Sequence, residues 1–413
     1  MKYDVIVVGG GPAGMAAAIE ARKTAEKVAI IERLDKLGGI LNQCIHNGFG
    51  LHYFKEELTG PEYAYRFAKM LQETDVDIYL NTFVTEIKPN QITIVNKDGK
   101  QVLETKSIVL SMGCRERTSG EIRLNGTRPV GVYTAGQAQR MINIYGKMPG
   151  KKVVILGSGD IGLIMARRLT FEGAKVLMVC EIMPTSSGLN RNIQQCLNDY
   201  DIPLKLSHTI TKVVGEQRLQ GVYVAQVDEN RNPIPETEQF VECDTLILSV
   251  GLIPETDLVD FIKINRITSG AFVDEYRQTS EKGVFACGNV LHVHDLVDNV
   301  TKESLLAGYS AGLYANGKLD TEKPFNITTG DGVRYVVPTT AYMNNEKFDI
   351  MFRLSKRIEK STICVMQGEE IIYKKFVLAG EGNEMQTITV DKSNIKCDVV
   401  VMVKEGRVWK QYV

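Results

Sequence analysis

Short runs of apolar residues, separated by glycines and polar residues, recur along the first 320 positions. Two of them, residues 5–8 and 152–156, are continuous enough to predict buried strands. Each is followed by a glycine-rich turn, a stretch of small and apolar residues that predicts a helix, and a second apolar run that ends in a glutamate, Glu32 or Glu181. This order of strand, turn, helix and strand, met twice, predicts two α/β units built on parallel sheets.

The first glycine turn has the spacing Gly-x-Gly-x-x-Gly. Gly9 permits the tight turn, Gly11 lets the backbone approach a pyrophosphate, and Gly14 lets the helix pack on the strand. The helix N-terminus then offers its free N–H groups and its positive dipole end to phosphates, and the carboxylate of Glu32 can accept hydrogen bonds from ribose hydroxyls. The turn therefore predicts a dinucleotide site. A plain βαβ unit and a signal peptide are the alternatives, and Asp4 and the glycines argue against the signal peptide.

The second turn repeats this spacing with Gly157, Gly159 and Gly162, and Glu181 closes the following strand. Two complete units are more specific than one, although the second could pack without binding anything. A carboxylate at this strand end hydrogen-bonds the ribose diol of NAD and repels the 2′-phosphate of NADP. Because no arginine directly follows Glu181, the sequence predicts NADH rather than NADPH.

The remaining pattern predicts the elements around the two turns. A helix from about Thr301 to residue 314 follows Gly288 and is rich in alanine and glycine. After residue 330, short strand-like runs separated by turn residues predict a small all-β domain of sandwich type. Strands are also predicted at residues 76–80, 84–88, 91–96, 100–103, 107–111, 210–214, 219–227, 244–250 and 284–286.

Charge and cysteine content exclude several classes of protein. The 413 residues carry a net charge of −1, so nothing favours a nucleic-acid surface, and no apolar run reaches the roughly 18–20 residues of a membrane helix. None of the eight cysteines forms a Cys-x-x-Cys pair, which argues against zinc and iron–sulfur sites and favours a reduced, cytoplasmic protein. The compact His292-x-His294-Asp295 is poor metal geometry, so no metal is expected.

With these elements placed, the chain resembles the pyridine nucleotide–disulfide oxidoreductases over residues 1 to about 320. The resemblance implies an α/β fold with two Rossmann-like domains of the glutathione-reductase-like, three-layer ββα type, one for FAD and one for NAD(H). The implied domains are residues 1–118 with 252–325 for FAD, 119–251 for NAD(H), and 326–413 for the β-rich C-terminal domain. The implied FAD contacts, with Val84 acting through its backbone, are Gly9, Gly11, Pro12, Ala13, Gly14, Glu32, Arg33, Gly39, Ile40, Val84, Gly113, Gly288 and Asn289. The implied NADH contacts are Gly157, Gly159, Gly162, Glu181 and Gly251.

Two positions depart from the family pattern. Asn289 stands where the family usually has an aspartate; its amide can still hydrogen-bond a ribityl or phosphate oxygen. The two cysteines of the redox dithiol are matched by Leu41 and His46, and Cys44 lies alone between them. A dithiol relay therefore has no residues to use.

A narrower match lies in three segments, residues 37–63, 113–117 and 288–295. They resemble FAD-dependent NAD(H) oxidoreductases that accompany an anaerobic-type glycerol-3-phosphate dehydrogenase, and they are similar to flavoprotein subunits of hydrogen cyanide synthase and of amine or hydroxyproline dehydrogenases. The resemblance implies hydride exchange with NAD(H) and electron transfer to or from such a partner subunit. A stand-alone NADH oxidase, a flavoprotein subunit of an amine or hydroxyproline dehydrogenase, and a non-catalytic binding subunit remain alternatives, and homo-oligomerisation is left open.

Overall fold

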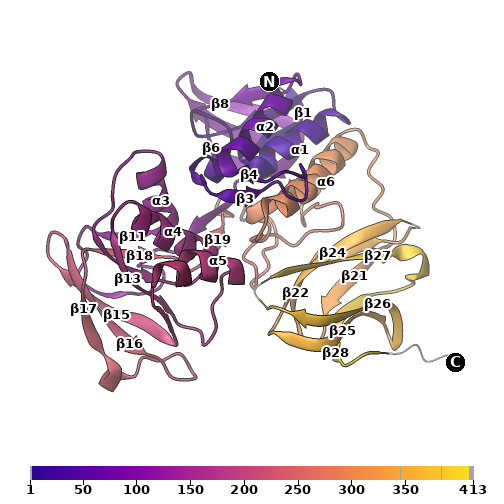
Figure 1. Cartoon of the computed structure of the whole chain (residues 1–413). Helices are drawn as coiled ribbons and strands as arrows, with labels where there is room; N and C mark the ends of the chain where they lie inside the picture. Colours follow the sequence, from indigo (N-terminus) through magenta and orange to yellow (C-terminus); the bar gives the residue numbers. More distant parts are fainter. Residues whose placement is uncertain (1, 345, 383, 409–413) are drawn as a thin grey trace. The chain divides into compact units, whose positions relative to one another are not determined.

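The computed structural model describes residues 2–344, 346–382 and 384–408. The chain divides into two compact units, one formed by Met1–Cys114 with Pro254–Val413 and the other by Arg115–Ile253. It passes from one unit to the other in β9 (Cys114–Glu116) and returns in β19 (Leu252–Pro254). Figure 1 shows the elements of both units.

The first unit is built on a sheet of seven strands. They are β1 (Lys2–Val8), β2 (Val28–Ile31), β5 (Asp77–Tyr79), β6 (Phe83–Lys88), β7 (Gln91–Asn96), β8 (Gly99–Leu110) and β20 (Val284–Ala286). Their order is β5-β2-β1-β8-β7-β6, and β20 also pairs with β8. β1 lies parallel to β2 and β8, whereas β6 and β7 form the predicted antiparallel hairpin.

β8 is one strand of 12 residues, where the sequence predicted two, at residues 100–103 and 107–111. Thr105 lies between the predicted strands, Ser107 begins the second of them, and both residues are buried. The Thr105 hydroxyl donates to the carbonyl oxygen of Ser107 at 2.8 Å, and the Ser107 hydroxyl donates to that of Ala311 at 3.0 Å. Because these hydroxyls find backbone acceptors, the strand continues through them.

The sheet has apolar residues on both faces, so structure packs on each side of it and three layers result. Val5 and Val7 of β1 pack in a core with the helices, whereas Ile6 and Val8 pack on the opposite face with the β6–β8 region. The helical layer, on the side of Val5 and Val7, contains α1 (Pro12–Arg22), α2 (Gly60–Gln72) and α6 (Val297–Ala315), and Figure 1 shows α1 beside α6. This arrangement confirms the predicted ββα fold.

α6 begins at Val297, four residues before Thr301, the start that the sequence predicted. Asp298 lies in the added first turn, and its Oδ1 atom accepts a hydrogen bond from the backbone N–H of Tyr53 at 2.9 Å. An acidic residue at this end of a helix also interacts favourably with the helix dipole. The earlier start therefore rests on a contact with a loop that lies far away in the sequence.

The loop before α2 has short elements of its own, namely η1 (Gly39–Gln43), β3 (Asn47–Phe49) and β4 (Leu58–Thr59). α2 starts with a capping box in which the Thr59 hydroxyl accepts from the Glu62 N–H, and the Glu62 carboxylate accepts from the Thr59 N–H. Pro61 lies at the beginning of the helix, as predicted.

The C-terminal part of the first unit contains two sheets, in agreement with the expected small β-domain. A five-stranded sheet has the order β23-β21-β28-β25-β26, and a three-stranded sheet has the order β22-β24-β27. Side chains that include Phe325, Phe352 and Val365 form their common core. The strands are β21 (Pro324–Thr329), β22 (Val333–Val337), β23 (Thr340–Tyr342), β24 (Lys347–Leu354), β25 (Ile358–Gln367), β26 (Glu370–Gly380), β27 (Met385–Asp391) and β28 (Val399–Glu405), with η5 (Lys392–Asn394) after β27.

The second unit contains a parallel sheet and an adjoining mostly antiparallel one. The parallel strands are β11 (Val132–Thr134), β18 (Thr245–Leu248), β12 (Lys152–Leu156), β13 (Lys175–Glu181) and β14 (Leu204–Leu206), given in sheet order. The other sheet contains β10 (Asn125–Gly126), β15 (His208–Gly215), β16 (Leu219–Gln226) and β17 (Gln239–Glu242). The helices are α3 (Ala135–Asn143), α4 (Asp160–Phe171) and α5 (Asn190–Cys196), with η2 (Asn198–Tyr200) and η3 (Pro235–Thr237). The predicted second strand–turn–helix–strand unit is therefore present as β12, α4 and β13.

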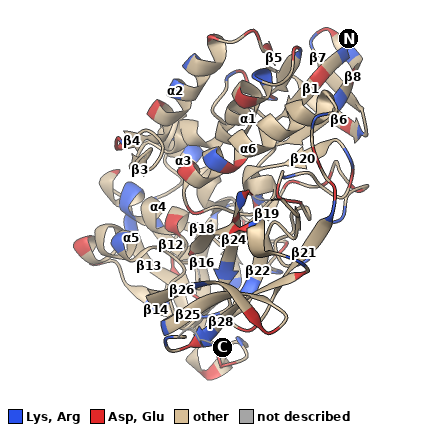
Figure 2. Ribbon diagram, turned by 90° about the vertical axis from the view of Figure 1, so that its right-hand side faces the viewer, with Lys and Arg blue, Asp and Glu red and all other residues tan. Residues whose placement is uncertain are grey.

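Both units carry charges of both signs, and Figure 2 shows Lys and Arg interspersed with Asp and Glu along the ribbon. Along the described ranges, no helix combines the length and apolar character required to cross a membrane.

Candidate dinucleotide sites

The first glycine turn connects β1 directly to α1. Gly11 is the N-cap of α1, and no side chain caps this helix end, so its first N–H groups are available to a ligand. Gly9 has φ +105°, and a Cβ atom on Gly14 would lie 1.7 Å from the carbonyl oxygen of Gly9. A Cβ atom on Gly11, in contrast, would meet nothing within 4 Å. The turn is thus closed by backbone contacts on one side and open where a phosphate would approach.

Glu32 at the end of β2 holds this turn from the side. Its side chain is buried; Oε2 accepts a hydrogen bond from the N–H of Gly10 at 2.7 Å, and Oε1 accepts one from the N–H of Leu34 at 2.8 Å. The carboxylate is therefore fixed against the turn at the position that the sequence analysis assigned to ribose recognition.

The second turn repeats this arrangement. Glu181 is buried to the same extent as Glu32, 6% exposed, and its Oε2 accepts from the N–H of Ser158 at 3.0 Å. Its Oε1 accepts from the N–H of Met183 at 3.0 Å. Ser158 and Met183 occupy the same places in their unit as Gly10 and Leu34 do in the first. Gly159 is the N-cap of α4, again without a side-chain cap.

Ser158 adds a feature that the first turn lacks. Its hydroxyl donates to Glu181 Oε2 at 2.6 Å and accepts from the N–H of Ser187 at 3.0 Å. Asp160, the first residue of α4, accepts from the N–H of Leu189 at 2.9 Å. No pattern in the sequence predicts these contacts of Ser187 and Leu189, because they depend on how the loop after β13 folds back onto the turn.

Segments far apart in the sequence meet at the first turn of α1. A Cβ atom on Gly39, which has φ +54°, would lie 3.0 Å from the Cα atom of Gly11. A Cβ atom on Gly288, which has φ +70°, would lie 2.9 Å from the Cβ atom of Ala13. The structure therefore brings together Gly9, Gly11, Pro12, Ala13, Gly14, Glu32, Gly39 and Gly288.

Other predicted contacts lie outside this group. Arg33 is exposed, Ile40 is 54% exposed, and Val84 lies half-buried in β6. Gly113 has φ +76°, and its carbonyl oxygen accepts from the N–H of Glu255. In the second unit, the carbonyl oxygen of Gly251 accepts from the N–H of Arg117 at 3.0 Å. Their roles toward a ligand stay predictions.

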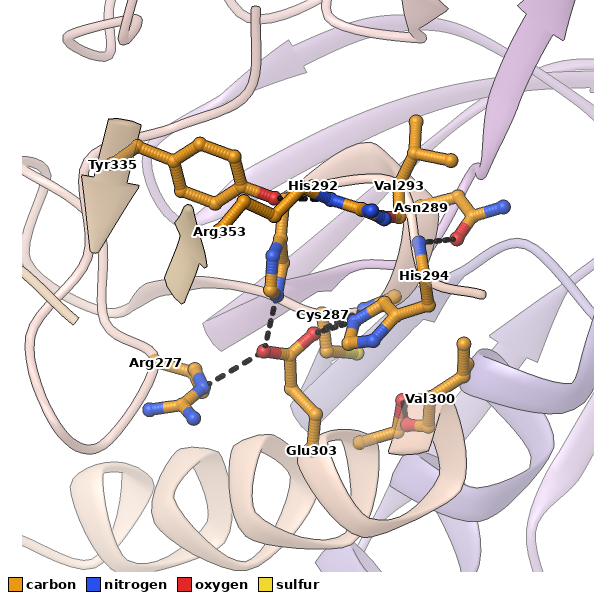
Figure 3. A network of polar contacts seen from close by, with 12 residues as sticks. Arg277, Cys287, Asn289, His292, Val293, His294, Val300, Glu303, Tyr335 and Arg353 are labelled. Atoms are coloured by element: carbon orange, nitrogen blue, oxygen red, sulfur yellow. Dashed lines mark hydrogen bonds and ion pairs between the residues drawn. The ribbon is translucent and has the colours of Figure 1, made fainter. Parts of the chain in front are cut away.

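Arg277, His292, His294 and Glu303 form a buried polar cluster, and Figure 3 shows the guanidinium and both imidazoles beside the Glu303 carboxylate. The Glu303 carboxylate accepts hydrogen bonds from Arg277 Nε and His292 Nε2, both at 3.1 Å, and from His294 Nε2 at 2.9 Å. It also accepts from the N–H of Gly288 at 2.8 Å. Burial lowers the pKa of His292 to about 4, so this imidazole is neutral at pH 7. The donors that face Glu303 hold its pKa well below the usual range, although burial opposes this shift.

The ligand atoms of His292, His294 and Glu303 lie within 4.8 Å of one another, close enough for a metal ion. Both imidazoles, however, already direct Nε2 at the carboxylate, and Arg277 supplies its positive charge. A cation bound among these atoms would have to displace Arg277 from Glu303. The cluster is therefore complete as an ion pair of Arg277 and Glu303 to which both imidazoles also donate.

Cys44 lies in the loop after η1. Its thiol donates to the carbonyl oxygen of Ile40 at 3.4 Å, and burial raises its pKa to about 12. A thiol with such a pKa is not a thiolate at pH 7, so it is a poor nucleophile.

Comparison with known proteins agrees with this geometry. Residues 3–304 match the family described as pyridine nucleotide-disulphide oxidoreductase. The chain belongs to this family. Members of this family are oxidoreductases that use FAD and NAD(P)H.

Individual members of the family are only moderately similar. Hydrogen cyanide synthase subunit HcnB of Pseudomonas protegens is 27% identical over 319 residues, which cover 70% of this chain and 66% of that protein. An NADH dehydrogenase of Ferdinandcohnia aciditolerans is 25% identical over 77% of this chain and 57% of that protein. The chain thus spans less than two thirds of the length of either relative. Thioredoxin reductase of Lactococcus lactis, 21% identical, shares the fold with a TM-score of 0.63 over 76% of this chain and 99% of that one.

The residues present fit both cofactors of the family. The uncapped start of α1 and the open space at Gly11 suit the pyrophosphate of FAD. The uncapped start of α4 and the buried Glu181 suit the adenosine half of a nicotinamide dinucleotide.

Proposed function

We propose that the protein exchanges a hydride between FAD and NAD(H) and passes electrons to or from a partner subunit, a glycerol-3-phosphate dehydrogenase or a similar dehydrogenase. The observation that carries the first half is the repeated carboxylate geometry at Glu32 and Glu181. Residues 1–118 with 252–325 would hold FAD, and residues 119–251 would hold NAD(H). Gly157, Gly159, Gly162, Glu181 and Gly251 would contact NADH.

NADH rather than NADPH is the proposed nucleotide because of Glu181. Its two oxygens are fixed by Ser158 and Met183, so the carboxylate cannot swing away from a 2′-phosphate. A negative charge held at this position repels the phosphate and accepts from the free hydroxyls of NADH.

FAD supplies, when bound, the ability to take up two electrons as a hydride and to release them again. The chain contributes the uncapped start of α1 for the diphosphate and the fixed Glu32 for the ribose. Cys44 is protonated at pH 7 because its pKa is raised to about 12, and no second cysteine lies beside it in the loop. Electrons are therefore proposed to leave by a route other than a dithiol, which favours a protein partner.

Three segments of the chain resemble flavoproteins that accompany glycerol-3-phosphate dehydrogenase, and this supports the choice of partner. The relative HcnB is itself named as a subunit, which supports a second candidate, a flavoprotein subunit of an amine or hydroxyproline dehydrogenase. The relative named NADH dehydrogenase supports a third, a stand-alone oxidase.

Anaerobic stopped-flow spectroscopy of the FAD-loaded protein tests the proposal. We expect NADH to bleach the visible flavin band rapidly and NADPH to do so much more slowly. Bound FAD that neither nucleotide reduces would refute hydride exchange with NAD(H). Rapid NADH consumption in air by the isolated chain would instead favour the oxidase, and reduction by an amine or by hydroxyproline would favour the second candidate.

A further inference from the structure

The turn between β20 and α6 is shaped by a single carboxylate. Glu303 is completely buried, and each of its oxygens accepts two hydrogen bonds. Oε1 accepts from Arg277 and His292, and Oε2 accepts from His294 and the N–H of Gly288. A carboxylate that receives four donors has no acceptor position to spare.

His292 and His294 make their contacts inside the protein rather than with a ligand. Because His292 is neutral and its Nε2 donates to Glu303, its ring carries the lone pair on Nδ1. Both Nδ1 atoms are buried and have no hydrogen-bond partner among the described residues. They are therefore out of reach of a ligand at the surface of the turn, and the rings support the turn from behind (Figure 3).

This support reaches Asn289 through the backbone of His294. The N–H of His294 donates to the Asn289 Oδ1 atom at 3.0 Å. The amide oxygen is thereby occupied, and the amide nitrogen Nδ2 must point the other way, where it makes a long contact of 3.6 Å with Cys114 Sγ. Sulfur is a weak acceptor, so the N–H groups of Asn289 are available to a better one.

We propose that the cluster of Arg277, His292, His294 and Glu303 turns Asn289 into a hydrogen-bond donor to FAD, in place of the acceptor carboxylate usual in this family. The natural acceptor is a phosphate oxygen of FAD, which accepts and cannot donate. Glu303 is then a positioning residue, and Asn289 is the residue that touches the cofactor. The inference rests on FAD binding at the first glycine turn.

Asn289→Asp tests the donor role, because it restores the family's usual residue. Asp can still accept from the His294 N–H, but its second oxygen would place a negative charge where Nδ2 donates. We expect the dissociation constant of FAD, measured by fluorescence titration of the apoprotein, to rise about tenfold or more. The loss should shrink at high salt, because salt screens the repulsion between the carboxylate and the phosphate.

Asn265→Asp is the matched control, since Asn265 Oδ1, like that of Asn289, accepts a hydrogen bond from a nearby backbone N–H, here that of Ile267. This variant should bind FAD like the wild type. Equal or tighter binding of FAD by Asn289→Asp would overturn the inference. If the wild-type apoprotein binds no FAD, the proposed function fails as well.

Glu303→Gln tests the positioning role. A glutamine has one acceptor oxygen, and its NH₂ group would face N–H donors, including that of Gly288. We expect weaker FAD binding together with an altered visible circular dichroism spectrum of the bound flavin. Glu275→Gln removes another buried carboxylate that is paired with Lys392, and it should lower stability without changing that spectrum. A Glu303→Gln protein that is folded and binds FAD with unchanged affinity and spectrum would contradict the positioning role.

Discussion

Replacing Glu181 by glutamine should reverse the nucleotide preference of the protein. The carboxylate accepts from the N–H and the hydroxyl of Ser158 and from the N–H of Met183. A glutamine can keep its oxygen toward Ser158, but its NH₂ group then faces the N–H of Met183. The variant loses one hydrogen bond to a charged acceptor and weakens two others, and a single such bond contributes about 1.5–3 kcal/mol.

The effect on nucleotides follows from the lost charge. NADH loses an anionic acceptor for its ribose hydroxyls, so its dissociation constant should rise about tenfold, which corresponds to about 1.4 kcal/mol. For NADPH, two unit charges 4 Å apart repel by about 4 kcal/mol at an effective dielectric constant of 20, and salt reduces this. Removing the charge should improve NADPH binding at least tenfold. The ratio of the two affinities should therefore change by about a hundredfold.

The assay is anaerobic reduction of bound flavin at increasing concentrations of each nucleotide, which yields both dissociation constants. Glu32→Gln is the matched control, because Glu32 contacts Gly10 and Leu34 in the same geometry. It should weaken FAD retention and leave the nicotinamide preference unchanged. An unaltered preference for NADH in a folded Glu181→Gln protein would refute the reasoning.

Three further outcomes follow from the first unit. Gly288→Ala should lose FAD, because φ +70° costs alanine about 1–2 kcal/mol and the new Cβ atom would lie 2.9 Å from that of Ala13. Gly317→Ala, which has φ +66° but open space around it, should retain FAD when the apoprotein is titrated with it. Lys392→Met leaves the Glu275 carboxylate buried without its cation, so urea unfolding should show a loss of about 3–5 kcal/mol; a loss below 1 kcal/mol would contradict this. The pKa of His292 falls from 6.5 to about 4 on folding, so the unfolded chain binds its proton first as pH drops; the stabilisation, about 3 kcal/mol, is present above pH 6.5 and lost toward pH 4. The difference between the urea midpoints at pH 7.5 and pH 4.5 should be smaller in His292→Gln than in the wild type, and equal differences in both proteins would exclude His292 as the cause.

Local sequence patterns were sufficient for the two dinucleotide units. Each glycine turn and its glutamate lie within about 25 residues of one another, and their spacing follows from the helix and strands between them. The continuous apolar run of residues 5–8 likewise matched a strand, β1, that is buried on both faces. Short strands were harder to predict: β21 carries two threonines and an asparagine, and β23 has three residues.

The sequence by itself thus determined the family, the two glycine turns and the identity of their carboxylates, because neighbouring residues set these through backbone geometry. Only the tertiary structure decided that Arg277 and Glu303 meet, since they lie 26 residues apart, one in a loop and the other in α6, and no local pattern specifies how the two pack. It also decided the orientation of the Asn289 amide, because the oxygen accepts from the backbone N–H of His294. Glu303 is a charged residue in a helix of small and apolar residues, a signal that predicts a buried partner but cannot name it.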